Sequence, residues 1–381
     1  MRDRRVLARL TILFVALSLV AAACGGGKSS SSSGSTTTSS QGKAVKGGTL
    51  VLGAEQEPDC ADWIASCAGS SWGIWMFGAF TMPRVFGFDQ ASGVPKITPL
   101  VTSEPKLVDT NPGGMTVTYE ISPKAVWSDG QPITSTDFKY TWTQIATGTE
   151  IYDKTGYEKI TKIDDSNPKV AVVTFGEDYG GWHDLFGGFY GVYPSHLLAG
   201  KDRHAEMKDG YKWSGGPWML DHWTKGQELK LVPNPKYWGA VPNLDAAVFK
   251  FVPQTSAEVE AYKSGQVAAI YPQAQLELEP LRTAPDTEFS VIDSLDYEAL
   301  WFNVDKPPLN SLKVRQALAY ATDRQAIVDA LFKPVNPDIQ PIQAFVTPAN
   351  PKWYSDPFKI YTHDLKKVDE LMTGDGWAKG S

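Results

Sequence analysis

The chain has 381 residues, of which 42% are hydrophobic and 12% aromatic. This is enough apolar material for a sizeable core and enough length for two or more domains, so we expect a globular protein rather than a disordered one. The formal net charge is −7, and an acidic surface argues against binding to nucleic acid.

The N-terminal residues 1–23 are typical of an export signal. Four arginines, at positions 2, 4, 5 and 9, precede the apolar run Leu10–Ala23, which is shorter than the roughly 20 residues that a membrane span needs. Without residues 1–23 the chain holds 32 Lys and Arg against 42 Asp and Glu, a net charge of −10. No other stretch is long and apolar enough to span a membrane, so we expect the mature protein outside the inner membrane.

The segment Leu19–Cys24 resembles the lipobox of bacterial lipoproteins, with Ala21 where that motif most often has Leu. The resemblance implies that the chain is cut before Cys24 and that Cys24 is diacylated, which would anchor the protein to the periplasmic or outer face of the cell membrane. The alternative is an ordinary secretory signal with an incidental Cys24. Residues 25–42 are almost wholly Gly, Ser and Thr, which predicts a flexible tether over residues 24–46.

Lipidation of Cys24 would leave Cys60 and Cys67 to pair with each other, which an oxidising compartment permits. If residues 60–67 were a straight helix, the two Cα atoms would lie about 10 Å apart, beyond the roughly 7 Å that a disulfide spans. Either the segment bends or both thiols stay free.

Strands and helices alternate along the rest of the chain, which predicts an α/β architecture. The predicted strands are Thr49–Leu52, Met115–Ile121, Val170–Phe175, Leu229–Val232, Val267–Tyr271 and Ala299–Val304. Thr255 and Glu258 read as the capping box of a short helix that Gly265 ends. A long helix is predicted from Ser311 to about Leu331.

Common catalytic motifs are absent. The chain has no Gly-rich phosphate loop, no Gly-x-Ser-x-Gly and no His-Glu-x-x-His. Its five histidines are scattered, without metal-ligand spacing to one another or to a cysteine. We therefore expect no catalytic residue, no metal and no cofactor.

Two features favour a ligand site. Glu55 and Glu57 follow the first predicted strand, and ligands of α/β sheets tend to bind at carboxyl ends of strands. A solvated loop explains these carboxylates about as well. Aromatic residues in Gly-rich segments, such as Trp72, Trp75 and Phe77, suit a binding groove as a group. Each one alone is better explained by packing beneath a loop.

Six segments in register resemble the family 5 extracellular solute-binding proteins, the dipeptide, oligopeptide and nickel receptors of ABC importers. They are Gly47–Leu50, Val126–Thr134 with Asp137 and Phe138, Val192–His196, Gly215–Trp218, Asn234–Trp238, and Leu300–Asn303 with the stretch up to Arg324. Order and spacing agree from about residue 47 onward. Ala268 departs from the pattern, since the family usually has an acidic residue there.

The resemblance implies a two-lobed α/β fold, like the type II periplasmic-binding proteins of the large, peptide-binding subclass. The first lobe would cover residues 47–265, with an inserted subdomain near 75–205, and residues 266–381 would form an incomplete second lobe. The family's last quarter would lie beyond Ser381, so the ligand site is expected to be only half present.

The implied function is capture of a small peptide or a related solute for an ABC permease and its ATPase, by a lipid-anchored monomer. The ligand-binding candidates are Ala54, Glu55, Gln56, Tyr271, Gln273, Trp301 and Asn303. Two other functions stay open: a signalling or chaperone-like lipoprotein that binds peptides or glycolipids without transport, and a secreted hydrolase.

Overall fold

The computed structural model describes residues 45–88, 94–109, 114–188, 190–272, 275–291, 297–348, 351–378 and 380. The predicted export signal, Cys24 and nearly all of the tether lie outside these residues, as does the candidate Gln273. None of the helices in the described ranges is long and apolar enough to cross a membrane.

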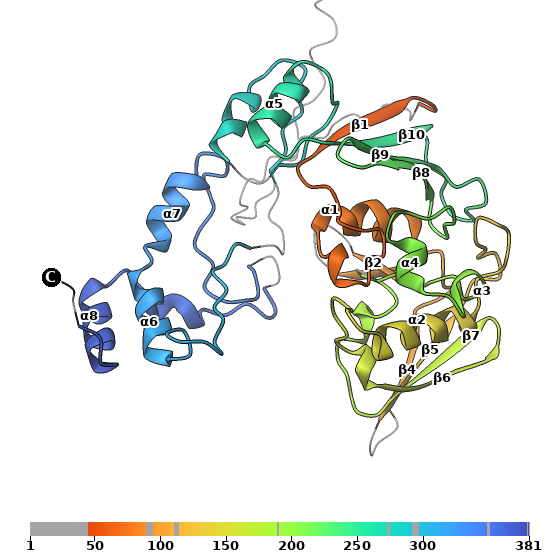
Figure 1. The fold of residues 1–381 in the computed structure, drawn as a ribbon, viewed down its shortest axis with the longest axis horizontal. Helices are drawn as coiled ribbons and strands as arrows, with labels where there is room; N and C mark the ends of the chain where they lie inside the picture. Colours follow the sequence, from red (N-terminus) through yellow and green to blue (C-terminus); the bar gives the residue numbers. More distant parts are fainter. Residues whose placement is uncertain are drawn as a thin grey trace, which may run out of the picture. The chain divides into compact units, whose positions relative to one another are not determined.

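One four-stranded sheet has the order β1-β10-β9-β8 (Figure 1). Its strands are β1 (Thr49–Ala54), β8 (Trp218–Thr224), β9 (Glu228–Pro233) and β10 (Ala246–Phe251). β1 runs parallel to β10, while the other neighbours are antiparallel. β10 is almost fully buried, as expected for an apolar strand covered on both faces. The strands predicted near Thr49 and Leu229 are thereby confirmed.

The segment Val267–Tyr271 was predicted to be a strand, and it is not one. It meets β1 through a single parallel bridge, Leu52 with Ala269, and through two backbone hydrogen bonds: Ala268 N donates to Val51 O, and Gly53 N donates to Ala269 O. The segment therefore follows the edge of β1 for only two residues before it turns away.

A second four-stranded sheet, entirely antiparallel, has the order β4-β5-β7-β6. Its strands are β4 (Lys106–Asp109), β5 (Met115–Glu120), β6 (Ile160–Asn167) and β7 (Val170–Phe175), and a separate hairpin pairs β2 (Phe86–Phe88) with β3 (Pro95–Ile97). Burial alternates strictly along β5, which confirms the predicted period of two.

Helix α2 (Ser135–Thr147) packs on β6 and β7 through an apolar stripe that includes Phe138 and Ile145. Its N-cap is Thr134, and the Asp137 carboxylate accepts the Thr134 N–H at 2.9 Å in a capping box. The short helices around this core are η1 (Ser66–Ala68), α1 (Ser71–Gly73), the π-helical η2 (Ile74–Ala79), η3 (Tyr157–Lys159), η4 (Trp182–Asp184), α3 (Ser195–Leu198) and α4 (Arg203–Met207).

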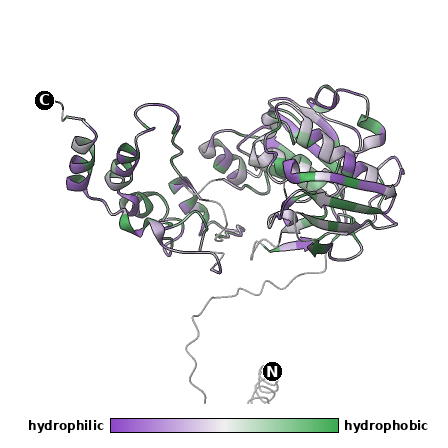
Figure 2. Ribbon diagram, turned by 90° about the horizontal axis from the view of Figure 1, so that it is seen from below, coloured by the Kyte–Doolittle hydropathy of each residue, from purple (hydrophilic) through white to green (hydrophobic). Residues whose placement is uncertain are grey.

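These elements enclose one continuous hydrophobic core. Hydrophobic stretches follow the strands that build it (Figure 2). Its largest fully buried side chains include Trp63, Trp127, Tyr119, Tyr157 and Tyr193. Most of the aromatic residues in this part of the chain are therefore core residues.

The later elements are mainly helical: α5 (Thr255–Lys263), η5 (Leu276–Leu281), α6 (Leu312–Ala321), α7 (Arg324–Leu331), η6 (Pro357–Ile360) and α8 (Leu365–Gly374). Among the described residues 297–304 there is no strand, so the strand predicted there is wrong. The single helix predicted from Ser311 is also wrong, because Thr322 is extended and the Asp323 carboxylate caps a new helix by accepting the Ala326 N–H.

Candidate ligand-binding site

The carboxyl end of β1 places Glu55 beside the start of α5. The Thr255 hydroxyl donates to Glu55 Oε1 at 2.7 Å, and the Gln275 side-chain amide donates to the Thr255 hydroxyl oxygen at 3.1 Å. Thr255 is the first residue of α5, whose N-cap Gln254 makes no side-chain cap. The predicted capping box is therefore wrong, because the Thr255 hydroxyl is used by Glu55. The helix N-terminus favours the negative charge of Glu55.

Glu258 lies one turn further along α5 and is fully buried. Neither of its carboxylate oxygens has a hydrogen-bond partner among the described residues. A Cβ at Gly53 would lie only 2.7 Å from Glu258 Oε1, so the glycine in β1 makes room for this carboxyl group. Burial, and secondly the charge of Glu55, raise the pKa of Glu258 to about 7. Sequence reasoning took Glu258 for a helix cap and missed its burial.

An aromatic group lies at the same end of β1. Tyr271 follows Ile270, whose side chain borders position 53. The Tyr271 ring centroid is 5.0 Å from that of Trp75 and 6.4 Å from that of Trp72, and both contacts are edge-to-face. Tyr271 is 56% exposed, whereas Trp72 is buried. Trp72, Trp75 and Tyr271, called the aromatic group below, thus offer a partly open surface near Glu55.

The other candidates of this first group take different positions. Ala54 is fully buried in β1 and Gln56 is exposed. The Glu57 carboxylate has a structural role, since it accepts the Trp223 indole N–H at 2.8 Å and the Gly226 N–H at 2.9 Å.

The structure does not bring Trp301 and Asn303 to this group. Trp301 is 76% exposed, and the Asn303 side-chain oxygen accepts the Asp305 N–H at 3.2 Å. In the described ranges no hydrogen bond or ring contact joins either residue to Glu55, Gln56 or Tyr271. The candidate site therefore consists of the carboxyl end of β1, the start of α5 and the aromatic group.

Cys60 and Cys67 form a disulfide with 5.7 Å between their Cα atoms. The segment between them bends, because only Ser66–Ala68 is helical and in the tighter 3₁₀ form. Of the two alternatives that the spacing left open, the structure has the bent one.

The family described as "Bacterial extracellular solute-binding proteins, family 5 Middle" matches residues 96–381. The oligopeptide-binding protein OppA of Mycobacterium bovis is 26% identical over 309 residues, which are 78% of this chain and 51% of OppA. The chain spans about half the length of the curated relatives it matches.

Two solved structures resemble this fold. The periplasmic EDTA-binding protein EppA matches with a TM-score of 0.73 and 25% identity, over 89% of this chain and 66% of EppA. The oligopeptide-binding protein AppA of Bacillus subtilis, solved with a nonapeptide, matches with a TM-score of 0.72 and 20% identity, over 88% of this chain and 66% of AppA. Both likenesses support the predicted two-lobed periplasmic-binding-protein fold.

Proposed function

The chain belongs to the bacterial extracellular solute-binding proteins of family 5, and from that membership we propose that it captures a peptide or a related solute for an ABC importer. A membrane permease and its ATPase would take the solute over, and the chain itself would catalyse no reaction. OppA and AppA support a peptide as the ligand, while EppA supports other small solutes in the same fold.

The observation that carries the proposal is that Glu55 and the aromatic group both lie at the carboxyl end of β1. A carboxylate accepts several hydrogen bonds, so Glu55 can receive a ligand N–H while Thr255 still holds its Oε1. The aromatic rings add apolar contact at a small loss of side-chain entropy. Such a surface suits a ligand with both polar N–H groups and apolar side chains, as peptides have.

The remaining candidates belong to the same proposal. Gln56 and Gln273 would add polar contacts beside Glu55, with Ala54 as the buried floor. Trp301 and Asn303 would come from the second of two lobes, residues 266–381, and would reach the ligand when that lobe closes on the first, residues 47–265.

Calorimetric titration with a mixture of short peptides tests the proposal. Glu55→Gln and Tyr271→Ala are each expected to weaken binding by about 1 to 3 kcal/mol, through a lost charge-assisted hydrogen bond or a lost ring surface. Glu260→Gln is the matched control, because Glu260 is an exposed residue of α5 whose carboxylate pairs with Lys263. Peptide binding that neither test substitution changes would contradict the proposed site, and native mass spectrometry of the protein from its host would identify the cargo.

We also propose that Cys24 is lipidated and that the protein sits at the outer face of the cell membrane. Cys24→Ser should move the protein from the membrane fraction to the medium or the periplasm. An unchanged distribution would contradict the anchor without touching the binding proposal.

A further inference from the structure

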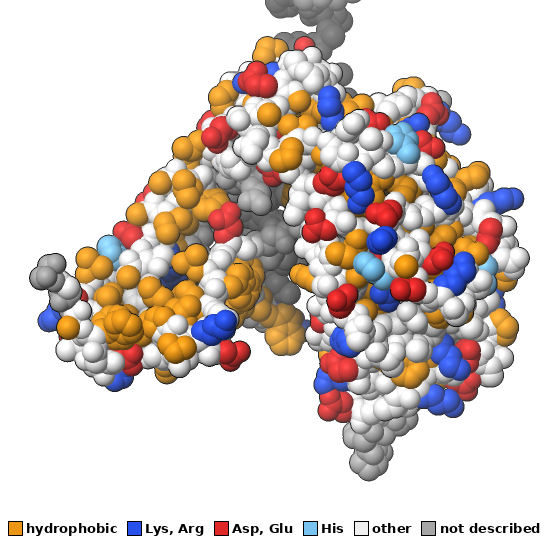
Figure 3. Space-filling model, in the orientation of Figure 1, with side chains coloured by type: hydrophobic (Ala, Val, Ile, Leu, Met, Phe, Trp, Pro, Cys, Tyr) orange, Lys and Arg blue, Asp and Glu red, His pale blue; other side chains and the backbone are white. Residues whose placement is uncertain are grey.

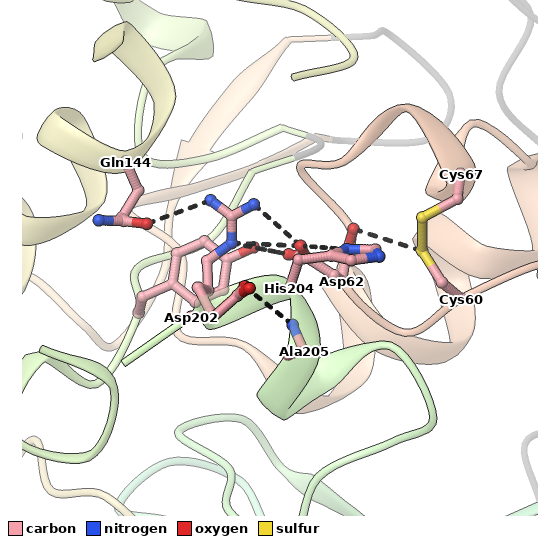
Figure 4. A network of polar contacts seen from close by, with 9 residues as sticks. Cys60, Asp62, Cys67, Gln144, Asp202, His204 and Ala205 are labelled. Carbon is pink, nitrogen blue, oxygen red and sulfur yellow. Dashed lines mark hydrogen bonds and ion pairs between the residues drawn. A yellow bond between two sulfur atoms is a disulfide. The ribbon is translucent and has the colours of Figure 1, made fainter. Parts of the chain in front are cut away.

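His204 lies between a buried carboxylate and the disulfide. It belongs to α4, and its Nδ1 is 3.1 Å from Asp62 Oδ2. A ligand atom of His204 and the two sulfur atoms of Cys60 and Cys67 all lie within 4.8 Å of one another. Figure 4 shows the imidazole placed between the Asp62 carboxylate and the disulfide. Residues far apart in the sequence thus bring two sulfurs and one imidazole together.

The Asp62 carboxylate is fixed in position. Asp62 is fully buried, and its carboxylate accepts the Tyr193 hydroxyl at 3.0 Å and the Arg203 guanidinium at 2.9 Å through Nη2. Arg203 is itself buried, and Gln144 lies within 3.4 Å of its Nη1. This network is drawn in Figure 4. A carboxylate held this firmly can orient any group that donates to it.

The hydrogen bond to Asp62 decides what His204 can offer. When Nδ1–H donates to the carboxylate, the lone pair of the neutral ring is on Nε2, and Nε2 can act as a metal ligand. A carboxylate behind the imidazole is the usual partner of a metal-binding histidine. The side chain of His204 is 43% exposed, so an ion can approach it from solvent.

We propose that reduction of the Cys60–Cys67 disulfide opens a zinc site whose ligands are the two thiolates and His204 Nε2. A dithiol supplies two electrons and two protons, becomes a disulfide itself and leaves two cysteine thiols. Binding of Zn²⁺ then releases the two thiol protons and forms two Zn–S bonds and one Zn–N bond. A water molecule completes the tetrahedron, as in sites with three protein ligands.

The backbone spacing suits such a site. Zn–S bonds of about 2.3 Å in a tetrahedron place the two sulfurs roughly 3.8 Å apart. The 5.7 Å between the Cα atoms can accommodate that separation through side-chain rotation. The oxidised protein lacks thiolates and offers the imidazole alone. The site therefore exists in one redox state only and is separate from the proposed peptide site.

Cobalt serves as a spectroscopic probe for zinc in the test. The full chain is reduced with dithiothreitol, freed of it under anaerobic conditions and titrated with Co²⁺. We expect a sulfur-to-cobalt charge-transfer band that saturates at one ion per chain and disappears when Zn²⁺ is added. The unreduced chain should show no band. His204→Gln should weaken the affinity by about tenfold or more.

His196→Gln is the matched control. His196 also pairs with a carboxylate, its Nε2 lying 2.8 Å from Asp129 Oδ2, but it does not belong to the cluster with the cysteines. The affinity of this variant should equal that of the parent chain. The proposal is overturned if the reduced chain gives no band, if the unreduced chain gives the same band, or if His204→Gln binds cobalt unchanged. Loss of the near-ultraviolet circular dichroism on reduction would overturn it as well, because the site needs the folded Asp62 network.

Discussion

Aromatic residues are used in opposite ways by the two parts of this chain. In residues 45–251 they are the centre of the core: Trp63 and Trp127 are at most 2% exposed. In the described part of residues 297–378 none of the aromatic side chains is buried, and Trp301 is 76% and Trp353 64% exposed. Figure 3 shows hydrophobic side chains gathered over the segment that contains α6 and α8. Similar residue types therefore serve burial in one part and remain accessible in the other.

Side-chain hydrogen bonds connect separate segments of the second part. The Arg324 guanidinium donates to the backbone oxygens of Ile342, Phe358 and Tyr361 and so joins α7 to the segment around Ile342 and to η6. The Ser311 hydroxyl bonds Asp375 at 2.7 Å near the start of α6. Such hydrogen bonds fix the relative positions of the segments that they join, but each adds only about 1 kcal/mol net to the free energy of unfolding. The first part therefore has a continuous core of buried apolar side chains, whereas hydrogen bonds in the second part join segments that lie far apart in the sequence.

The largest expected effect concerns the buried ion pair of the first part. Asp62→Ala should lower the free energy of unfolding by about 4 kcal/mol, because Arg203 keeps a buried charge without its partner. Urea denaturation at neutral pH measures this. Asp165→Ala is the control: Asp165 pairs with the exposed Lys139 at 2.9 Å, and such pairs contribute about 0 to 1 kcal/mol. Equal losses in both variants would contradict the view that burial sets the cost.

Two tryptophan substitutions test directly whether aromatic residues stabilise the two parts to different extents. Trp63→Ala should cost about 3 kcal/mol, since the ring stacks on Tyr193 with 4.3 Å between the centroids. The loss falls at the low end for a buried Trp because the indole N–H has no partner among the described residues. Trp301→Ala should change stability by less than about 0.5 kcal/mol. Thermal and urea unfolding of both variants would show whether the two regions differ as described.

The sequence predicted the strands of the first part well. β5 and β7 have alternating burial on a sheet with one buried face, so their period is visible in the residues themselves. The motif around Trp127 and Asp137 also has a structural role. The Trp127 indole nitrogen lies 3.3 Å from the Asp137 carboxylate. The same carboxylate caps α2 and accepts the Ser195 hydroxyl. These residues fix the scaffold and not a ligand.

The later elements could not be predicted as well, for physical reasons. The residues of Val267–Tyr271 have strand propensity, but a strand needs a partner over its whole length, and β1 offers only two residues. The break between α6 and α7 occurs where the Asp323 carboxylate accepts the Ala326 N–H and caps a new helix. The periodicity of apolar residues does not reveal this local hydrogen bond. In the candidate site, the sequence singled out Glu55 by its position after β1. It could not reveal Glu258, since its burial follows from the packing of α5 on Gly53.

The burial of Glu258 should make the unfolding free energy depend on pH. Its pKa is raised from 4.5 to about 7 in the folded protein, so the folded state holds a proton that the unfolded chain releases at lower pH. Stability should therefore fall as the pH rises from about 4.5 to 7, by about 3 kcal/mol in total, and change little from this cause above pH 7. Glu258→Gln should remove that slope, as measured by urea unfolding at several pH values.

The control for Glu258 lies on the same helix. Glu260→Gln replaces an exposed carboxylate of α5 that pairs with Lys263 at 2.9 Å, and it should leave the slope in place. A slope that survives in Glu258→Gln would mean that another group holds the proton.

The smallest effect on stability is expected for a substitution in the second part, Leu365→Lys, which should also reduce self-association of the protein. Leu365 begins α8 and is 60% exposed, so Leu365→Lys removes little buried area and should change the unfolding free energy by less than about 0.5 kcal/mol. Exposed apolar side chains in this region favour self-association and dye binding. The substitution should therefore lower the fluorescence of bound anilinonaphthalene sulfonate and the concentration dependence of light scattering.

Val173→Lys, at a fully buried position of β7, serves as the contrasting variant, because a charge placed in the first core should unfold the protein and raise both signals. If Leu365→Lys destabilised the chain as strongly as Val173→Lys, α8 would have a packed apolar face, and the contrast between the two parts would not hold.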